Sequence, residues 1–410
     1  MTARRIAHAL LLASSGLLAA CQNTPEVTKP DYSRQLRPGE SALRLITDPA
    51  RMPDLAGAYD RSRNEADLML QAIDQSITWF NAPSSRQFFP FSTAGRSITH
   101  EQARASVHAF RQAYESAGGG REFAAEIRAR FDVYESVGYN GEGIVLYTGY
   151  YAPIFDASRT PSATYRCPLY KRPADLATDP VTGEPRGRSM PDGSTAPYPT
   201  RREIESSGML AGTELVWLKD ELDAYIVQVN GSAKLRLDDG SIMYVGYAGK
   251  TDRPYTGLGR MMVDEGLIPP DQLSLTAIKA YFRKDPARVK SLIQRNESYV
   301  FFTEYPDSNW PAGSLGVRVT ERATLATDKK IYPRGGVVLV DTQAVTLSQA
   351  KRRFFQFMMD QDTGGAIQAP GRADIFMGTG ETAEVLAGGQ YAEGRLYYFF
   401  LKPGESLAGP

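Results

Sequence analysis

The sequence has 410 residues, of which 42% are hydrophobic and 10% aromatic, so it can bury a core without disulfides or structural metals. Basic and acidic side chains number 47 each, and this zero formal charge disfavours a nucleic-acid-binding protein, which is usually basic. The length fits about two domains, or one domain with a large insertion.

The first 20 residues have the composition of a secretory signal peptide. Arg4 and Arg5 precede an apolar stretch that is too short for a permanent membrane span. The stretch ends in "LAAC" (18–21), which is typical of a bacterial lipobox, so we expect Cys21 to be lipidated. Gln22 at the next position favours the outer membrane, periplasmic face. A plain signal peptide cleaved after Ala20 is the alternative. Residues 21–60 are then expected to form a tether and an entry loop.

Cysteine and histidine are scarce. With Cys21 lipidated, Cys167 has no disulfide partner, and we expect it to be a small buried side chain. His100 and His108 lie on one predicted helix that we expect at the surface. Two such histidines make a poor metal site or catalytic triad, so we expect no metal and no cofactor and attribute any chemistry to carboxylates.

Three further segments follow the tether. Residues 61–135 have helical periodicity. Residues 150–298 begin with a Pro-rich loop (157–198), continue as strands with predicted hairpin turns at Asn230-Gly231 and Asp239-Gly240, and end in a helix. Residues 299–410 read as short strands, with a helix-like start at 346–354.

The sequence "GKT" at 249–251 is part of a phosphate-binding-loop motif but lacks its spacing. The full motif needs a glycine at position 244, where this chain has tyrosine. We interpret the segment as a strand end followed by a turn.

Asp362 and Asp374 bracket a glycine-rich loop. Apolar neighbours of Asp374 would raise the pKa of a buried carboxyl, as a general acid requires, and Asp362 could supply coupling. Gly364 and Gly365 would let a ligand approach the backbone. A solvated β-turn that happens to carry two acids is the alternative. An aspartic protease is a further alternative for "DTG" at 362–364, but Gly365 replaces the usual Ser or Thr, and the single motif would require a dimer.

Six segments together resemble the membrane-bound lytic murein transglycosylase A family. They are "YTGYYAPIF" (147–155), "YPTRREI" (198–204), "VGYAGKTDRPYTGLGR" (245–260), "NESYVFF" (296–302), "ERATLATDKKIYPRG" (321–335) and "DTGGAIQAPGRADIFMGTG" (362–380). They occur in the family's order and cover most of the chain after residue 20.

The resemblance implies a mainly β fold with helices, of the α+β class. A double-psi β-barrel-like domain would be assembled from residues 61–149 and 299–410, with a three-aspartate domain at about 310–402. A smaller β domain would be inserted at 150–298, and a deep groove would separate the two.

The implied activity is that of a peptidoglycan lytic exotransglycosylase, a murein lyase. The β-1,4 bond between N-acetylmuramic acid and N-acetylglucosamine is cut without water, leaving a 1,6-anhydro end. Asp374 would be general acid and then base, and Asp362 would orient the site. The expected substrate contacts are Thr148, Tyr150, Gly364, Gly365, Arg372 and Asp328, although Asp328 could instead cap a turn.

The implied partners are peptidoglycan strands, a membrane reached through the lipid anchor, and cell-wall synthesis or hydrolysis proteins. A peptidoglycan-binding lipoprotein without catalytic activity is the alternative from another class.

Overall fold

The structure, a computed structural model, describes residues 30–93, 95–180 and 182–405. The predicted signal peptide and Cys21 lie outside this range. Within it, no helix has the length and apolar character needed to cross a membrane. The helices are α1 (Leu55–Ser62), α2 (Ala66–Asn81), α3 (His100–Ser116), α4 (Gly120–Arg130), α5 (Arg201–Ser207), α6 (Glu221–Asn230), α7 (Leu258–Asp264), α8 (Leu275–Lys284), α9 (Pro286–Ile293) and α10 (Gly380–Gly389).

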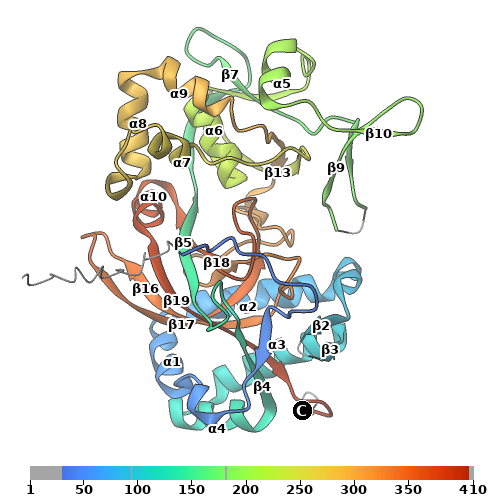
Figure 1. The fold of residues 1–410 in the computed structure, drawn as a ribbon, viewed down its shortest axis with the longest axis vertical. Helices are drawn as coiled ribbons and strands as arrows, with labels where there is room; N and C mark the ends of the chain where they lie inside the picture. The colour runs from blue at the N-terminus through green and yellow to red at the C-terminus, as the bar shows by residue number, and fades with distance from the viewer. Residues whose placement is uncertain (1–29, 94, 181, 406–410) are drawn as a thin grey trace, which may run out of the picture. The chain divides into compact units, whose positions relative to one another are not determined.

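Six strands form a closed β-barrel. They are β5 (Val145–Ala152), β15 (Thr324–Ala326), β16 (Val337–Val345), β17 (Lys351–Asp362), β18 (Arg372–Thr379) and β19 (Tyr391–Leu401). Their order is β19-β16-β17-β15-β18-β5, and β5 pairs again with β19. The pairs β15–β17 and β5–β18 are parallel, and the other pairs in the ring are antiparallel. Figure 1 shows β5 beside β18, although more than 200 residues separate them in sequence. The barrel confirms the predicted α+β class.

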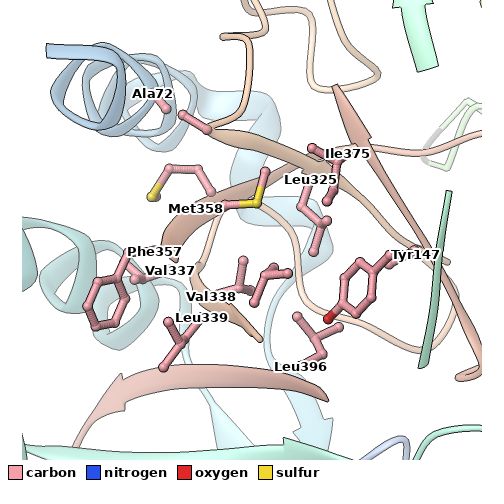
Figure 2. Close-up of a cluster of buried hydrophobic side chains, with 14 of the residues drawn as sticks. Ala72, Tyr147, Leu325, Val337, Val338, Leu339, Phe357, Met358, Ile375 and Leu396 are labelled. Atoms are coloured by element: carbon pink, nitrogen blue, oxygen red, sulfur yellow. The ribbon is translucent and has the colours of Figure 1, made fainter. Parts of the chain in front are cut away.

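The barrel strands are apolar on both faces because one face fills the barrel and the other is covered by helices. Figure 2 shows Tyr147, Val338 and Leu396, from three different strands, directed toward one another. Phe357 instead packs against Phe110 of α3 and Phe123 of α4. Strands β4 (Phe131–Ser136) and β1 (Leu43–Leu45) extend the sheet beyond β19. Residues 43–45, within the predicted tether, are therefore part of the folded domain.

A second sheet lies between β5 and β15 in the sequence. Its order is β14-β13-β12-β6-β11-β7, with strands β6 (Ile154–Ser158), β7 (Cys167–Tyr170), β11 (Glu214–Leu218), β12 (Ser232–Leu237), β13 (Ile242–Lys250) and β14 (Val300–Tyr305). Strand β14 belongs to this sheet although it lies beyond residue 298. The sheet and helices α5–α9 are called the insert below. Cys167 is 8% exposed in the insert core, which confirms that it is buried.

The hairpin predicted at Asn230-Gly231 is wrong. Residues 221–230 form helix α6, whose N-cap Asp220 accepts a hydrogen bond from the N–H of Asp223. Gly231 ends the helix with φ at 74°, a left-handed conformation that suits glycine. Six residues of α6 are buried, five of them consecutive (224–228), so its apolar run resembles a buried strand. The turn at Asp239-Gly240 does join two antiparallel strands, β12 and β13, as predicted.

Three other local predictions also need correction. The helix-like start at 346–354 is a turn followed by β17, which begins at Lys351; Leu347 lies in the turn and is 63% exposed, so the stretch has no buried helical face. The Pro-rich stretch 157–198 contains strand β7 and a small sheet of β8 (Leu176–Thr178), β9 (Pro185–Ser189) and β10 (Thr195–Ala196). His100 is on a helix as predicted but is only 6% exposed, since its ring packs against Phe80 and Phe89.

Candidate active site

The two aspartates that bracket the glycine-rich loop lie on the two strands that flank one short strand, β15, on opposite sides. Ala326 of β15 is in register with Asp362 of β17 on one side and with Asp374 of β18 on the other. Two strand spacings separate the aspartate backbones, about 10 Å. Thr148 of β5 is in register with Asp374 on its far side. Four neighbouring strands of the barrel wall therefore carry a row of positions: Asp362, Ala326, Asp374 and Thr148. The four residues are far apart in the sequence.

Asp374 is held by two neighbours and is partly accessible. The Thr148 hydroxyl donates a hydrogen bond to Oδ1 of Asp374. Arg372 donates from Nη2 to the Thr148 oxygen at 3.1 Å and lies 3.7 Å from Oδ1 of Asp374. Oδ2 of Asp374 has no hydrogen-bond partner among the described residues, and the side chain is 15% exposed. One carboxylate oxygen is thus fixed and the other is available to a ligand.

Asp362 accepts three hydrogen bonds. Its Oδ1 accepts from the backbone N–H groups of Ser314 and Thr363, each at 2.8 Å, and its Oδ2 accepts from the Tyr150 hydroxyl at 2.8 Å. Burial raises the pKa of Asp362, and these donors act in the opposite direction. Burial, and then the Asp362 charge, raise the pKa of the Tyr150 phenol. Both carboxylate oxygens of Asp362 are therefore occupied by hydrogen bonds from the protein itself.

The third expected acid, Asp328, has backbone partners at both oxygens. Its Oδ1 accepts from the N–H of Lys330 at 3.0 Å and its Oδ2 from the N–H of Ala369 at 2.9 Å. These contacts fit the turn-capping interpretation and fasten the 328–330 turn to the loop after Asp362. Gly364 and Gly365 lie exposed on that loop.

Sequence reasoning missed a buried ion pair behind Asp362. Lys329 Nζ pairs with Asp360, and the two side chains are 3% and 0% exposed. Asp360 also accepts hydrogen bonds from the hydroxyls of Thr327 (2.9 Å) and Tyr398 (2.8 Å). Burial raises the pKa of Asp360 and lowers that of Lys329. The available signal was a carboxylate two residues before Asp362, directly after the buried pair Met358 and Met359.

The insert also contributes to the site. Burial, and then Tyr225 of α6, raise the pKa of the Tyr255 phenol, and the Asp374 charge acts in the same direction. Tyr255 belongs to the conspicuous segment 245–260, but nothing local distinguished it from a core tyrosine. Among the residues that the structure describes, no three His, Cys, Asp or Glu side chains gather as a metal site would require.

The residues of the site lie in two segments of the chain that match known domain families. The family described as "MltA specific insert domain" matches residues 146–303, and the "3D domain" family matches residues 323–400. The chain is also 30% identical over 268 residues to the membrane-bound lytic murein transglycosylase A of Vibrio cholerae. That alignment covers 63% of this chain and 66% of the relative, just under two thirds of the relative's length.

Solved structures share the fold. A membrane-bound lytic murein transglycosylase from Agrobacterium tumefaciens matches with a TM-score of 0.70 and 24% identity, covering 88% of this chain and 98% of the other. Escherichia coli MltA with bound chitohexaose matches with a TM-score of 0.65 and 22% identity, covering 92% and 99%. Barrel and insert therefore occur together in known proteins.

Proposed function

This chain belongs to the membrane-bound lytic murein transglycosylase A family, and we propose that it cleaves the β-1,4 bond between N-acetylmuramic acid and N-acetylglucosamine in peptidoglycan. The cleavage uses no water and leaves a 1,6-anhydro-N-acetylmuramic acid end. Chitohexaose bound to the E. coli family member supports a glycan strand as ligand, because that hexamer shares the N-acetylglucosamine units and β-1,4 bonds of murein.

The observation that carries the proposed residue roles is the difference between the two carboxylates. Both oxygens of Asp362 accept hydrogen bonds, whereas Oδ2 of Asp374 has no partner among the described residues. A residue that transfers protons to and from a substrate needs a free oxygen within reach of it. We therefore assign Asp374 as the acid and base, and Asp362 as the residue that orients Tyr150 and the adjoining loop.

In the first step Asp374 donates its proton to the glycosidic O4 as the bond between C1 and O4 breaks. Its carboxylate, now negative, lies beside the Arg372 guanidinium. In the second step the carboxylate takes the proton of the sugar's own C6 hydroxyl, and O6 bonds to C1. Asp374 thus regains in the second step a proton to replace the one that it gave up in the first. Since the nucleophile is part of the substrate, the reaction gains the advantage of an intramolecular attack, and no second catalytic carboxylate is needed.

The remaining contacts fit supporting roles. Thr148 fixes the rotamer of Asp374, and Tyr150 packs on Phe376 with ring centroids 5.1 Å apart while it donates to Asp362. Gly364 and Gly365 leave the rim of the loop without side chains where a sugar would pass. We assign Arg372 to charge balance at Asp374. The contacts of Asp328 support a structural role more than substrate binding.

We also propose an outer-membrane lipoprotein. The grounds are the lipobox-like "LAAC" before Gln22 and the "membrane-bound" name of the relatives. Lipid at Cys21 would hold the site at the periplasmic face, near peptidoglycan and the proteins that build or degrade it. Mass spectrometry of the mature N-terminus checks this: a diacylglyceryl-modified Cys21 supports the anchor, and an unmodified N-terminus at that residue contradicts it.

The activity test uses the full chain with Cys21→Ser and purified peptidoglycan sacculi, without added metal. Released muropeptides are identified by mass. Products with a 1,6-anhydro end, lighter by one water than hydrolysis products, support the proposal. Products with a reducing end would mean that water is the nucleophile and would overturn the proposed mechanism. Binding without release would favour a binding lipoprotein.

A further inference from the structure

Lys250 is the lysine of the "GKT" segment, and the proposed reaction does not use it. It is the last residue of β13 in the insert. Its ammonium reaches the loop that follows Asp362, because a β-carbon built on Gly365 would lie 3.8 Å from Lys250 Nζ. A cation from the insert therefore lies against the glycine-rich rim of the proposed active site.

The Lys250 ammonium has no hydrogen-bond acceptor or ion-pair partner among the described residues, and the residue is half-buried. Burial lowers the pKa of Lys250, and the nearby Lys330 acts in the same direction. An unpaired, partly buried ammonium is unfavourable in the free protein. Such a group is therefore suited to an anion that arrives with a ligand.

Two more cations lie in the same region. The Asp328 carboxylate bonds the N–H groups of Lys330 and Ala369, so Lys330 is held beside the loop that Lys250 touches. The Arg334 guanidinium stacks on a phenyl ring, 4.2 Å from the ring centroid, and has no ion-pair partner within the described part of the chain.

The acid that these cations share is Glu184, from the hairpin between β8 and β9. It lies 3.7 Å from Lys330 Nζ, and its charge acts on both Lys250 and Arg334. The Asp360 charge also acts on Arg334, and Asp328 bonds the backbone of Lys330, whereas the Lys250 ammonium has no bonded acid among the described residues. Glu184 belongs to the Pro-rich stretch 157–198. Its contact with Lys330 brings that stretch close to the proposed active site.

We propose that Lys250, with Lys330 beside it, forms an anion subsite that binds a carboxylate carried by the muramyl residue of the glycan strand. This inference rests on the proposed function. N-acetylglucosamine carries no acid, whereas the muramyl residue carries a lactyl group at C3, on the ring whose C1 is cleaved. The lactyl carboxylate is free in peptide-free strands. In peptide-bearing strands it is an amide, and the stem supplies carboxylates instead.

The test measures equilibrium binding by calorimetry in the full chain with Cys21→Ser and Asp374→Asn, so that no ligand is cleaved. The ligands are peptide-bearing muramyl strands, peptide-free muramyl strands and neutral chitohexaose. Lys250→Gln removes the charge, Lys250→Arg keeps it, and Lys284→Gln changes an exposed lysine on α8 of the insert as the matched control. Thermal unfolding of each variant verifies folding.

We expect Lys250→Gln to weaken binding of muramyl strands about tenfold, the range of one charge-assisted contact, and to leave chitohexaose binding within about twofold. Lys250→Arg and Lys284→Gln should resemble the parent. A loss confined to peptide-bearing strands identifies a stem carboxylate, and a loss confined to peptide-free strands identifies the lactyl carboxylate. An equal loss for all three ligands, or no loss, overturns the subsite. Failure of the proposed reaction shows separately, as absence of anhydro products from the variant with only Cys21→Ser.

Discussion

At the scale of single residues, Asp374 and Asp362 should respond differently to the same substitution. Asp374→Asn keeps the shape of the side chain but removes the proton, so kcat should fall by about 10²–10⁴-fold with an unchanged melting temperature. Asp362→Asn places an amide among three donors, which should cost about 1–3 kcal/mol of stability and a smaller part of the activity. Release of anhydro-muropeptides and thermal unfolding measure the two effects.

Full activity of Asp374→Asn, combined with complete loss in Asp362→Asn, would reverse these roles. Thr148→Val is an informative companion, because it removes the hydrogen bond to Asp374 and the acceptor of the Arg372 guanidinium while it keeps the size of the side chain. A partial loss of kcat with KM unchanged is expected for it, since the carboxylate stays in place but loses its orientation.

The buried pair of Lys329 and Asp360 should matter for stability more than for catalysis. Lys329→Met leaves the Asp360 carboxylate buried without its cation, which should cost about 3–5 kcal/mol in the free energy of unfolding. Burial already raises the pKa of Asp360, and loss of the lysine raises it further. The folded variant then holds a proton that the unfolded chain releases, so the deficit should shrink as pH falls.

Denaturant titrations at several pH values measure this deficit. The double variant Lys329→Met with Asp360→Asn is the matched control, because it removes both charges and should recover much of the lost stability. A cost below about 1 kcal/mol for Lys329→Met alone would show that the pair is poorly desolvated, contrary to the burial of both side chains.

At the scale of elements, the packing of α10 on β5 depends on the absence of a side chain at Gly149. A β-carbon there would lie 2.9 Å from the Cα of Ala387 in α10. Gly149 lies between Thr148 and Tyr150, so a shift of the strand would move both site residues. Gly149→Ala should therefore destabilise the fold by about 1–3 kcal/mol and also lower activity.

Gly336→Ala is a suitable control in the same barrel. Its β-carbon would meet Phe400 and Tyr398 at ordinary contact distances of 3.8–4.0 Å. Thermal unfolding and muropeptide release measured on both variants separate crowding at β5 from a general intolerance of the barrel to alanine. Equal behaviour of the two variants would contradict the packing argument.

At the scale of the whole folded unit, a charged cluster joins the insert to the barrel. Lys279 of α8 pairs with Glu384 of α10 at 2.6 Å, and the Tyr151 hydroxyl of β5 donates to the same carboxylate at 2.9 Å. Burial, and then the charge of Asp220, raise the pKa of Asp223 in α6 to about 7, with Glu384 acting in the same direction. The link between the two parts should therefore depend on pH.

The sign follows from the proton affinity of Asp223. Its folded pKa of about 7 exceeds the unfolded value of 3.8, so the folded state binds the proton more tightly. The contribution of Asp223 to stability is greatest below about pH 4, falls as pH rises toward 7, and is constant above that. Asp223→Asn should flatten the pH dependence of the free energy of unfolding between pH 4 and 7. An unchanged slope in that interval would contradict the raised pKa.

The sequence predicts an element well when the residues that specify it are neighbours in the chain. Turn residues at Asp239-Gly240 and the helical period of 100–116 act through neighbours in the chain, and both elements form as predicted. The ordered motifs identified the family. The apolar runs in α6 and β17 carried no such local information, because a short buried run is compatible with a helix or a strand.

The sequence by itself determined the residue types of the site: two aspartates around a glycine loop, with Thr148 and Arg372 among the expected contacts. Only the tertiary structure decided their relation. Barrel closure puts Asp362, Ala326, Asp374 and Thr148 in one row, and it leaves one oxygen of Asp374 free while both oxygens of Asp362 accept hydrogen bonds. The same folding brings Lys250 of the insert to Gly365. Pairing between strands distant in sequence is set by the packing of the whole chain, so no local pattern could reveal these contacts.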